Sequence, residues 1–200
     1  MKRPFFVLAV TLAVLTAAAI PGCSTNQQGD SAAPVFLVGS FSGNFVPNSS
    51  CVNMTGPLTV KTTTVTSRLK VPGTATTQFL DVHLDRYSVV WTRIDGGTAV
   101  SPTESFAYVG GLVAPGGTST CTDCGYMSVT DLQRPPLDQL FPFNGGIDKE
   151  TGSAQIRQVA NVTWYGHTLA GEPVTSDVAT FEVDFEYCAS AGRIEQKRAR

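Results

Sequence analysis

Residues 181–187 read FEVDFEY and alternate between large apolar and acidic side chains. In a β-strand, successive side chains point to opposite faces, so Phe181, Val183, Phe185 and Tyr187 would share one face and three carboxylates the other. A period of two with one apolar face is typical of an antiparallel sheet that packs on a core on one side and meets solvent on the other. The stretch therefore indicates an all-β protein.

Similar strand signals recur upstream, with turn residues between them. The segment 169–173 (LAGEP) turns the chain between the last two expected strands, and the 19 glycines and 12 prolines of the chain indicate many further turns. Residues 115–124 are expected to form a polar loop, and Pro135-Pro136 to begin a short helix over 137–141. The eight expected strands are Val35–Phe41, Leu58–Leu69, Phe79–Asp85, Tyr87–Ile94, Phe106–Val113, Tyr126–Leu132, Ile156–Tyr165 and Val174–Tyr187. The third and fourth of these could instead form one long bent strand. We expect an antiparallel β-sandwich, immunoglobulin-like in the broad sense, with a closed barrel as the alternative.

The N-terminus has the three parts of a secretory signal peptide. Lys2 and Arg3 form a positive start, residues 5–20 are uncharged and mostly apolar, and Gly22 precedes Cys23. The tract resembles a bacterial lipoprotein signal, although Pro21 departs from the usual small residue. This resemblance implies cleavage after Gly22 and a lipid on Cys23. An ordinary signal peptide cut nearby is the alternative, and a membrane-spanning helix is disfavoured because the apolar run is shorter than about 20 residues.

The same tract predicts where the protein resides and how the chain is divided. Ser24 follows the cysteine and no acidic residue does, which by resemblance to proteobacterial sorting favours the outer membrane over the inner membrane. The predicted divisions are residues 1–22 as signal peptide, 23–33 as flexible tether, 34–190 as the β-domain and 191–200 as a basic, disordered tail.

Charge argues against a nucleic-acid partner. The 14 Lys and Arg residues of the chain include Lys2 and Arg3, so 12 basic residues face 16 acidic residues in the mature part, a net charge of −4. The basic residues of the C-terminal tail are best explained by a solvated terminus, and electrostatic contact with acidic lipid or a partner is the alternative. A nucleic-acid-binding domain would instead need a basic face.

Four cysteines remain after Cys23, namely Cys51, Cys121, Cys124 and Cys188. An even number in an exported domain indicates disulfides. We favour a local Cys121–Cys124 bond and a long-range Cys51–Cys188 bond, with the two crossed pairings still open. A redox, haem or zinc role for the C-x-x-C pair is disfavoured, because Gly125 and a strand follow it and no second C-x-x-C occurs.

No catalytic, metal or cofactor site is predicted. The nucleophile motif G-x-S-x-G is absent, and the row Glu182, Asp184 and Glu186 is interpreted as a solvated strand face. His83 lies between Asp81 and Asp85 at alternating positions, which is either a weak metal patch or, as we favour, a wet sheet face. His167 has no metal-ligand spacing to another histidine.

Candidate binding residues come from aromatic side chains and loops. Trp164 and Tyr165 are neighbours in an expected strand, so they face opposite ways and one of them is a candidate for stacking on a glycan or a partner protein. Rigid sandwiches carry binding on their loops. We therefore expect contacts in the loops around Cys51, around Cys121 and Cys124, and over 141–152.

Two tracts carry a further resemblance. Residues 162–171 (VTWYGHTLAG), with the strand that runs on to Tyr187, and residues 87–96 (YSVVWTRIDG) resemble segments of uncharacterised exported lipoproteins of Gram-negative bacteria with a β-sandwich domain. The resemblance implies the fold and the compartment and brings no known activity. We expect a non-enzymatic accessory or protein-interaction module, lipid-anchored through Cys23, with an envelope protein as partner. A carbohydrate-binding or adhesin-like module is the alternative.

Overall fold

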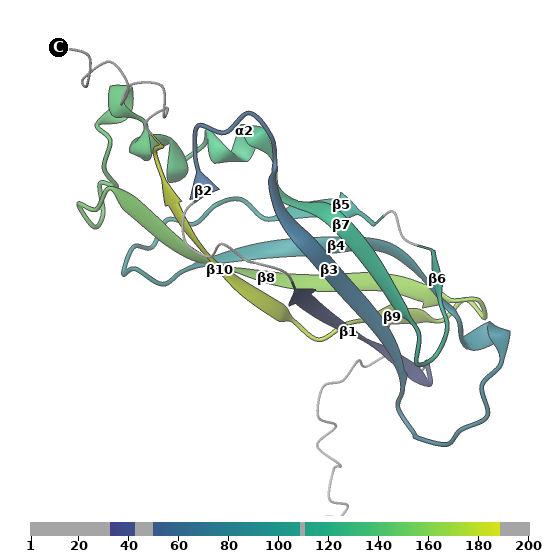
Figure 1. The fold of residues 1–200 in the computed structure, drawn as a ribbon. Coiled ribbons are helices and arrows are strands. Elements are labelled where there is room, and N and C mark those ends of the chain that lie inside the picture. The colour runs from purple at the N-terminus through teal and green to yellow at the C-terminus, as the bar shows by residue number, and fades with distance from the viewer. Residues whose placement is uncertain (1–32, 43–49, 109–110, 189–200) are drawn as a thin grey trace, which may run out of the picture.

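The computed structural model describes residues 33–42, 50–108 and 111–188. The predicted signal peptide, the predicted lipidation site Cys23, most of the predicted tether and the basic tail lie outside these ranges. The described chain forms two packed β-sheets, with most of its short helical segments gathered near one end (Figure 1). The all-β sandwich expected from the sequence is therefore confirmed.

The smaller sheet has three strands in the order β1-β3-β7, all antiparallel. They are β1 (Val35–Ser42), β3 (Leu58–Leu69) and β7 (Thr118–Met127). The first two match the expected strands closely, because each is a run of β-branched and aromatic residues bounded by turn residues.

The larger sheet has the order β2-β10-β8-β4-β5, with β6 added on β4 and β9 on β8. Its pairings are antiparallel except for the parallel pair of β2 with β10. Its strands are β2 (Ser50–Cys51), β4 (Val82–Arg93), β5 (Glu104–Ala107), β6 (Leu112–Val113), β8 (Gln155–Thr168), β9 (Pro173–Thr175) and β10 (Ala179–Glu186). The two expected strands between 79 and 94 form a single strand, β4.

The region around the C-x-x-C pair differs from expectation. Residues 118–127 form strand β7 and include both cysteines, whereas a loop was expected up to Cys124. The expected strand over 126–132 ends at Met127 and is followed by helix α2 (Val129–Leu132). Ser128 starts this helix because its side chain accepts a hydrogen bond from the Asp131 backbone N–H, a capping arrangement that outweighs strand propensity.

Three 3-10 helices complete the described chain. They are η1 (Gln78–Leu80), η2 (Leu137–Leu140) and η3 (Pro142–Asn144). The expected helix over 137–141 is thus a 3-10 turn. Leu137 and Leu140 are fully buried, so they fix this segment to the core.

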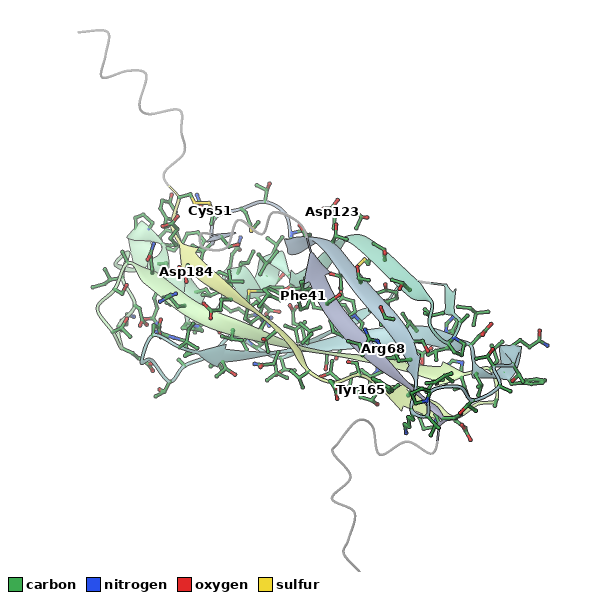
Figure 2. All side chains as sticks on the ribbon, turned by 60° about the horizontal axis from the view of Figure 1, so that its bottom comes forward. Phe41, Cys51, Arg68, Asp123, Tyr165 and Asp184 are labelled. Atoms are coloured by element: carbon green, nitrogen blue, oxygen red, sulfur yellow. A yellow bond between two sulfur atoms is a disulfide. The ribbon has the colours of Figure 1, made fainter. Side chains whose placement is uncertain are left out.

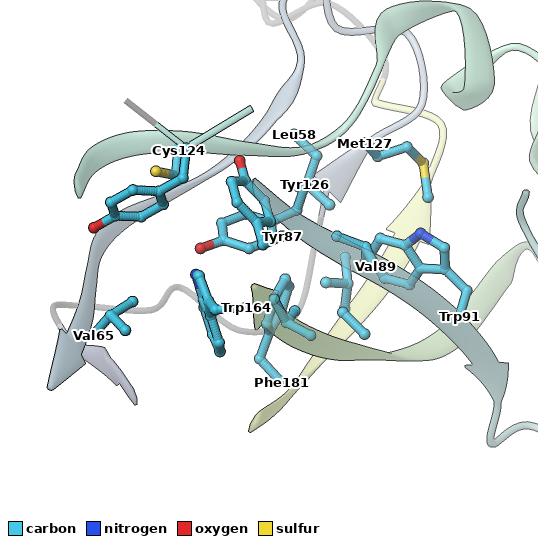
Figure 3. Packing of buried hydrophobic residues seen from close by; sticks show 14 of the residues in the cluster. Leu58, Val65, Tyr87, Val89, Trp91, Cys124, Tyr126, Met127, Trp164 and Phe181 are labelled. Atoms are coloured by element: carbon cyan, nitrogen blue, oxygen red, sulfur yellow. The ribbon is translucent and has the colours of Figure 1, made fainter. Parts of the chain in front are cut away.

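A cluster of aromatic rings packs among aliphatic side chains in the core between the sheets (Figure 3). Trp164 of β8 is fully buried and packs near Tyr87 of β4, with ring centroids 6.4 Å apart. Tyr126 of β7 packs edge-on to Phe181 of β10 at 5.1 Å. Phe181, Val183 and Phe185 of the alternating row therefore face the core, as the alternation predicts.

The strand register defines two ends of the sandwich. One end, which we call the disulfide end, holds the start of β8 and the end of β10, where Gln155 pairs with Glu186 and Glu186 with Cys51. At the opposite end, the entry end, β1 begins at Val35, opposite Leu69. Figure 2 shows Cys51 and Asp184 toward one end and Arg68 and Tyr165 toward the other. The 14 residues of β8 run from one end to the other, a distance of about 40 Å.

Candidate functional site

A disulfide fixes the end of the last strand. Cys51 is bonded to Cys188, with the two Cα atoms 5.2 Å apart. Beside this bond, the Val52 N–H donates to the Glu186 carbonyl at 2.9 Å, and the Asn53 amide donates to the Cys188 carbonyl at 2.8 Å. The second disulfide joins Cys121 to Cys124 within β7. The structure thus contains the pairing that the sequence favours.

A groove of about 550 Å³ lies at this end of the sandwich. Its lining combines apolar side chains with polar ones, including Leu140, Pro142, Gly146, Gln155, Glu186 and Tyr187. The Gln155 side-chain amide donates to the Glu186 carboxylate at 3.0 Å, so a polar pair stands on one side of the groove.

Three aromatic rings stand beside the groove, and we call Phe141, Phe143 and Tyr187 the aromatic patch. The rings of Phe141 and Phe143 lie 5.3 Å apart, and those of Phe141 and Tyr187 lie 5.7 Å apart. Phe143 is 82% exposed and Tyr187 is 39% exposed. Tyr187 is the last residue of the alternating FEVDFEY row, so its ring lies just beyond the core and joins the patch instead.

Two glycines shape the turn that follows Phe143. Gly145 and Gly146 have φ values of 117° and 74°, in the left-handed region that side chains other than glycine rarely adopt. The Gly146 N–H donates to the Phe141 carbonyl at 3.0 Å, and the Gly145 N–H donates to the Pro142 carbonyl at 3.3 Å. The turn therefore holds the backbone of the patch in a compact loop.

A buried ion cluster ties this loop to the larger sheet. Arg93, at the end of β4, donates to Asp148 at 2.8 Å and to Asp95 at 2.6 Å and 2.8 Å. The Asp148 carboxylate also accepts hydrogen bonds from the backbone and hydroxyl of Thr151. Burial raises the pKa of Asp148, but the hydrogen bonds from Arg93 and Thr151 outweigh it and lower that pKa to about 2. Asp148 is therefore ionised at neutral pH and anchors the loop.

A second titratable cluster lies where β5 meets helix α2. The Glu104 carboxylate accepts a hydrogen bond from the Ser128 backbone N–H at 2.8 Å, and the Asp131 carboxylate accepts one from the Ser128 hydroxyl at 3.0 Å. Burial, followed by a hydrogen bond with Asp131, raises the pKa of Glu104 to about 7. The hydrogen bond from Glu104 lowers the pKa of Asp131, so below about pH 7 the pair holds one proton, which resides on Glu104.

Near the entry end, both histidines of the chain lie together on the exposed face of the larger sheet. His83 of β4 is the direct cross-strand partner of His167 of β8. Asp85 bridges them and accepts a hydrogen bond from each Nδ1 at 3.0 Å. The pairing of β4 with β8 cannot be predicted from the local sequence pattern. The sequence therefore associated His83 only with Asp81 and Asp85. Asp81 precedes β4 and is not part of the cluster.

The two aromatic binding candidates have different positions. Trp164 is fully buried in the core, so it is unavailable to a ligand in the folded protein. Tyr165 is half-buried on the outer face, where the Arg86 guanidinium lies 4.5 Å above its ring. The exposed aromatic surface is thus greater at Phe143, a residue that the sequence analysis covered only as part of the loop 141–152.

Two of the three loop regions expected to make contacts come together in space. The Cys51 region and residues 141–152 both lie at the disulfide end, because Cys51 is bonded to Cys188 and Tyr187 packs on Phe141. Cys121 and Cys124 lie instead within a strand of the smaller sheet. The groove and the aromatic patch are formed by residues 140–155 together with Glu186 and Tyr187, and the Cys51 region is held at the same end by its disulfide.

Comparisons with family models, with curated proteins and with solved structures find no match for this chain. Within the described ranges, the structure has no helix that is long and apolar enough to cross a membrane.

Proposed function

We propose that the protein is a lipid-anchored, non-enzymatic binding module of the bacterial cell envelope that holds an envelope protein at its disulfide end. The observation that carries this proposal is the exposed aromatic patch beside a groove of about 550 Å³. Tyrosine and other aromatic residues are enriched at protein interfaces, and burial of one such ring is worth about 2 kcal/mol. An apolar segment of a partner protein fits this surface.

The position of the patch supports a display role. The described chain enters at Ala33, next to the start of β1 at the entry end, and the groove lies at the other end of β8. With the lipid on Cys23, residues 24–33 would connect the membrane to the entry end. The groove would then face away from the membrane by about the length of β8, or about 40 Å. A partner in the envelope could reach it without obstruction by the bilayer.

The rigidity of the loop supports binding rather than a passive role. The loop that follows Phe143 is held by its double-glycine turn and by the buried contacts of Asp148 with Arg93 and Thr151. A surface that is already ordered loses less conformational entropy on binding than a flexible one.

Glycan binding is the second candidate function, and a specific feature of the groove favours it. Gln155 and Glu186 place an amide and a carboxylate on one side of the groove that Tyr187 also lines, and such groups hydrogen-bond to sugar hydroxyls. The two functions make different demands on Phe143. A protein partner needs its exposed apolar ring, whereas a glycan depends more on the polar pair.

Site-specific photocrosslinking in cells of the native host tests the proposal. A photoreactive phenylalanine analogue replaces Phe143, and the matched control carries it at Phe79. Phe79 is also in a 3-10 helix, is 58% exposed and lies at the entry end. One recurrent envelope protein crosslinked from position 143 and not from position 79 supports the proposal. Equal labelling from both positions, or no protein adduct from 143, contradicts it, and saturable binding of a purified glycan would then favour the second candidate.

A further inference from the structure

The chain contains two histidines in all, and the fold places both at one point. His83 and His167 are far apart in sequence and come from different strands. Their rings face each other across the β4–β8 ladder, with centroids 5.3 Å apart. Asp85, two residues after His83, lies on the same outer face of the sheet.

An irregularity in β4 orients this cluster. The register of β4 against β8 shifts between Leu84 and Arg86, so Asp85 is an extra residue in the ladder. As a result Asp85 and Arg86 are both exposed, although neighbours in a regular strand face opposite ways. Bulges of this kind re-aim side chains and are common next to functional sites.

A glycine on the partner strand permits the close approach of the two strands at the bulge. Gly166 lies opposite Leu84, immediately before His167. A Cβ atom added at Gly166 would collide with the backbone carbonyl of His83. The local sequence of both strands thus brings the two imidazoles together.

The donor atoms have the spacing of a metal-ligand set. One nitrogen or oxygen from each of His83, Asp85 and His167 lies within 4.8 Å of the other two. Each Nδ1 is 3.0 Å from a different oxygen of the Asp85 carboxylate. The three side chains are between 44% and 49% exposed, so an ion from solvent has direct access.

Fold stability alone does not account for the cluster. Ion pairs between side chains this exposed contribute little to stability, because water screens their charges. The fold nevertheless places two imidazoles around one carboxylate and tolerates a bulge and a close strand approach to do so.

The chemistry of the donors selects the kind of ligand. Imidazole nitrogen together with carboxylate oxygen suits zinc and its neighbours among the first-row divalent metals. Calcium and magnesium prefer sites made of oxygen alone. We propose that His83, Asp85 and His167 form a binding site for one divalent transition-metal ion, with Zn²⁺ as the reference ion and at least one coordination position left to water. The site is separate from the groove and goes beyond the proposed function.

Zinc binding to the full-length protein tests this site. The protein is purified in detergent without a polyhistidine tag, depleted of metal, and titrated with Zn²⁺ against a chromophoric chelator. We expect one saturable Zn²⁺ per chain with which Ca²⁺ does not compete. His83→Gln, His167→Gln and Asp85→Asn should each lower the affinity by about tenfold or more.

A matched carboxylate serves as the control. Asp81 is two residues before His83, as Asp85 is two residues after it, but it lies outside the cluster. Asp81→Asn should leave the affinity for Zn²⁺ unchanged, and thermal unfolding checks that every variant folds. Absence of saturable Zn²⁺ binding overturns the proposal, as does binding that survives both histidine substitutions.

Discussion

The Arg93 guanidinium lies 2.8 Å from the Asp148 carboxylate, and both side chains are buried. This pair joins the end of a central strand to the loop that follows Phe143. Asp148→Ala should lower the free energy of unfolding by about 3 kcal/mol, because the buried Arg93 loses one of its two carboxylate partners. Urea unfolding measures the loss, and Lys149→Ala, an exposed neighbour, is the control. Equal midpoints for the two variants would show that the pair does not anchor the loop.

A pH dependence of stability follows from Glu104. Its pKa is about 7 in the folded protein and 4.5 for the unperturbed group, so between these values the folded state holds a proton that the unfolded state has lost. The free energy of unfolding should therefore fall as the pH rises from about 4.5 to about 7.

Glu104→Gln isolates this effect. Glutamine imitates the protonated acid, because its amide oxygen can accept from the Ser128 N–H and its NH₂ group can donate to Asp131. The free energy of unfolding of this variant should not fall over that pH window. The variant should therefore be more stable than the natural protein at pH 8. Urea unfolding at several pH values makes the comparison, and parallel curves for the two proteins would rule out a raised pKa at Glu104.

Local sequence pattern and long-range strand pairing determine different parts of this structure. The row at 181–187 indicated the correct core face because strand periodicity is a local property. The prediction of a loop up to Cys124 was wrong, because this threonine-rich stretch pairs with β3 as strand β7. The meeting of His83 with His167 depends on the register of β4 against β8, and the patch depends on the contact of Tyr187 with Phe141. Both are long-range relationships that no local pattern contains.

Membrane anchoring is a prediction from the N-terminal sequence. The protein from native cells should appear in the membrane fraction, and mass spectrometry of its N-terminal peptide should show a lipid on Cys23. Cys23→Ala should abolish that modification and release the protein from membranes or block its processing. An unmodified Cys23 in a soluble natural protein would exclude the anchored arrangement.

The central claim is that the aromatic patch at the disulfide end binds an envelope protein. The most direct measurement is the dissociation constant of the purified protein for the partner crosslinked from position 143, compared with Phe143→Ser and Phe79→Ser. Burial of the Phe143 ring in the complex is worth about 2 kcal/mol. The Phe143→Ser variant should therefore bind the partner with a dissociation constant raised by about tenfold or more. Phe79→Ser, at the other end of the sandwich, should bind like the natural protein. Equal affinity of the natural protein and the Phe143→Ser variant, with both folded, would contradict the account.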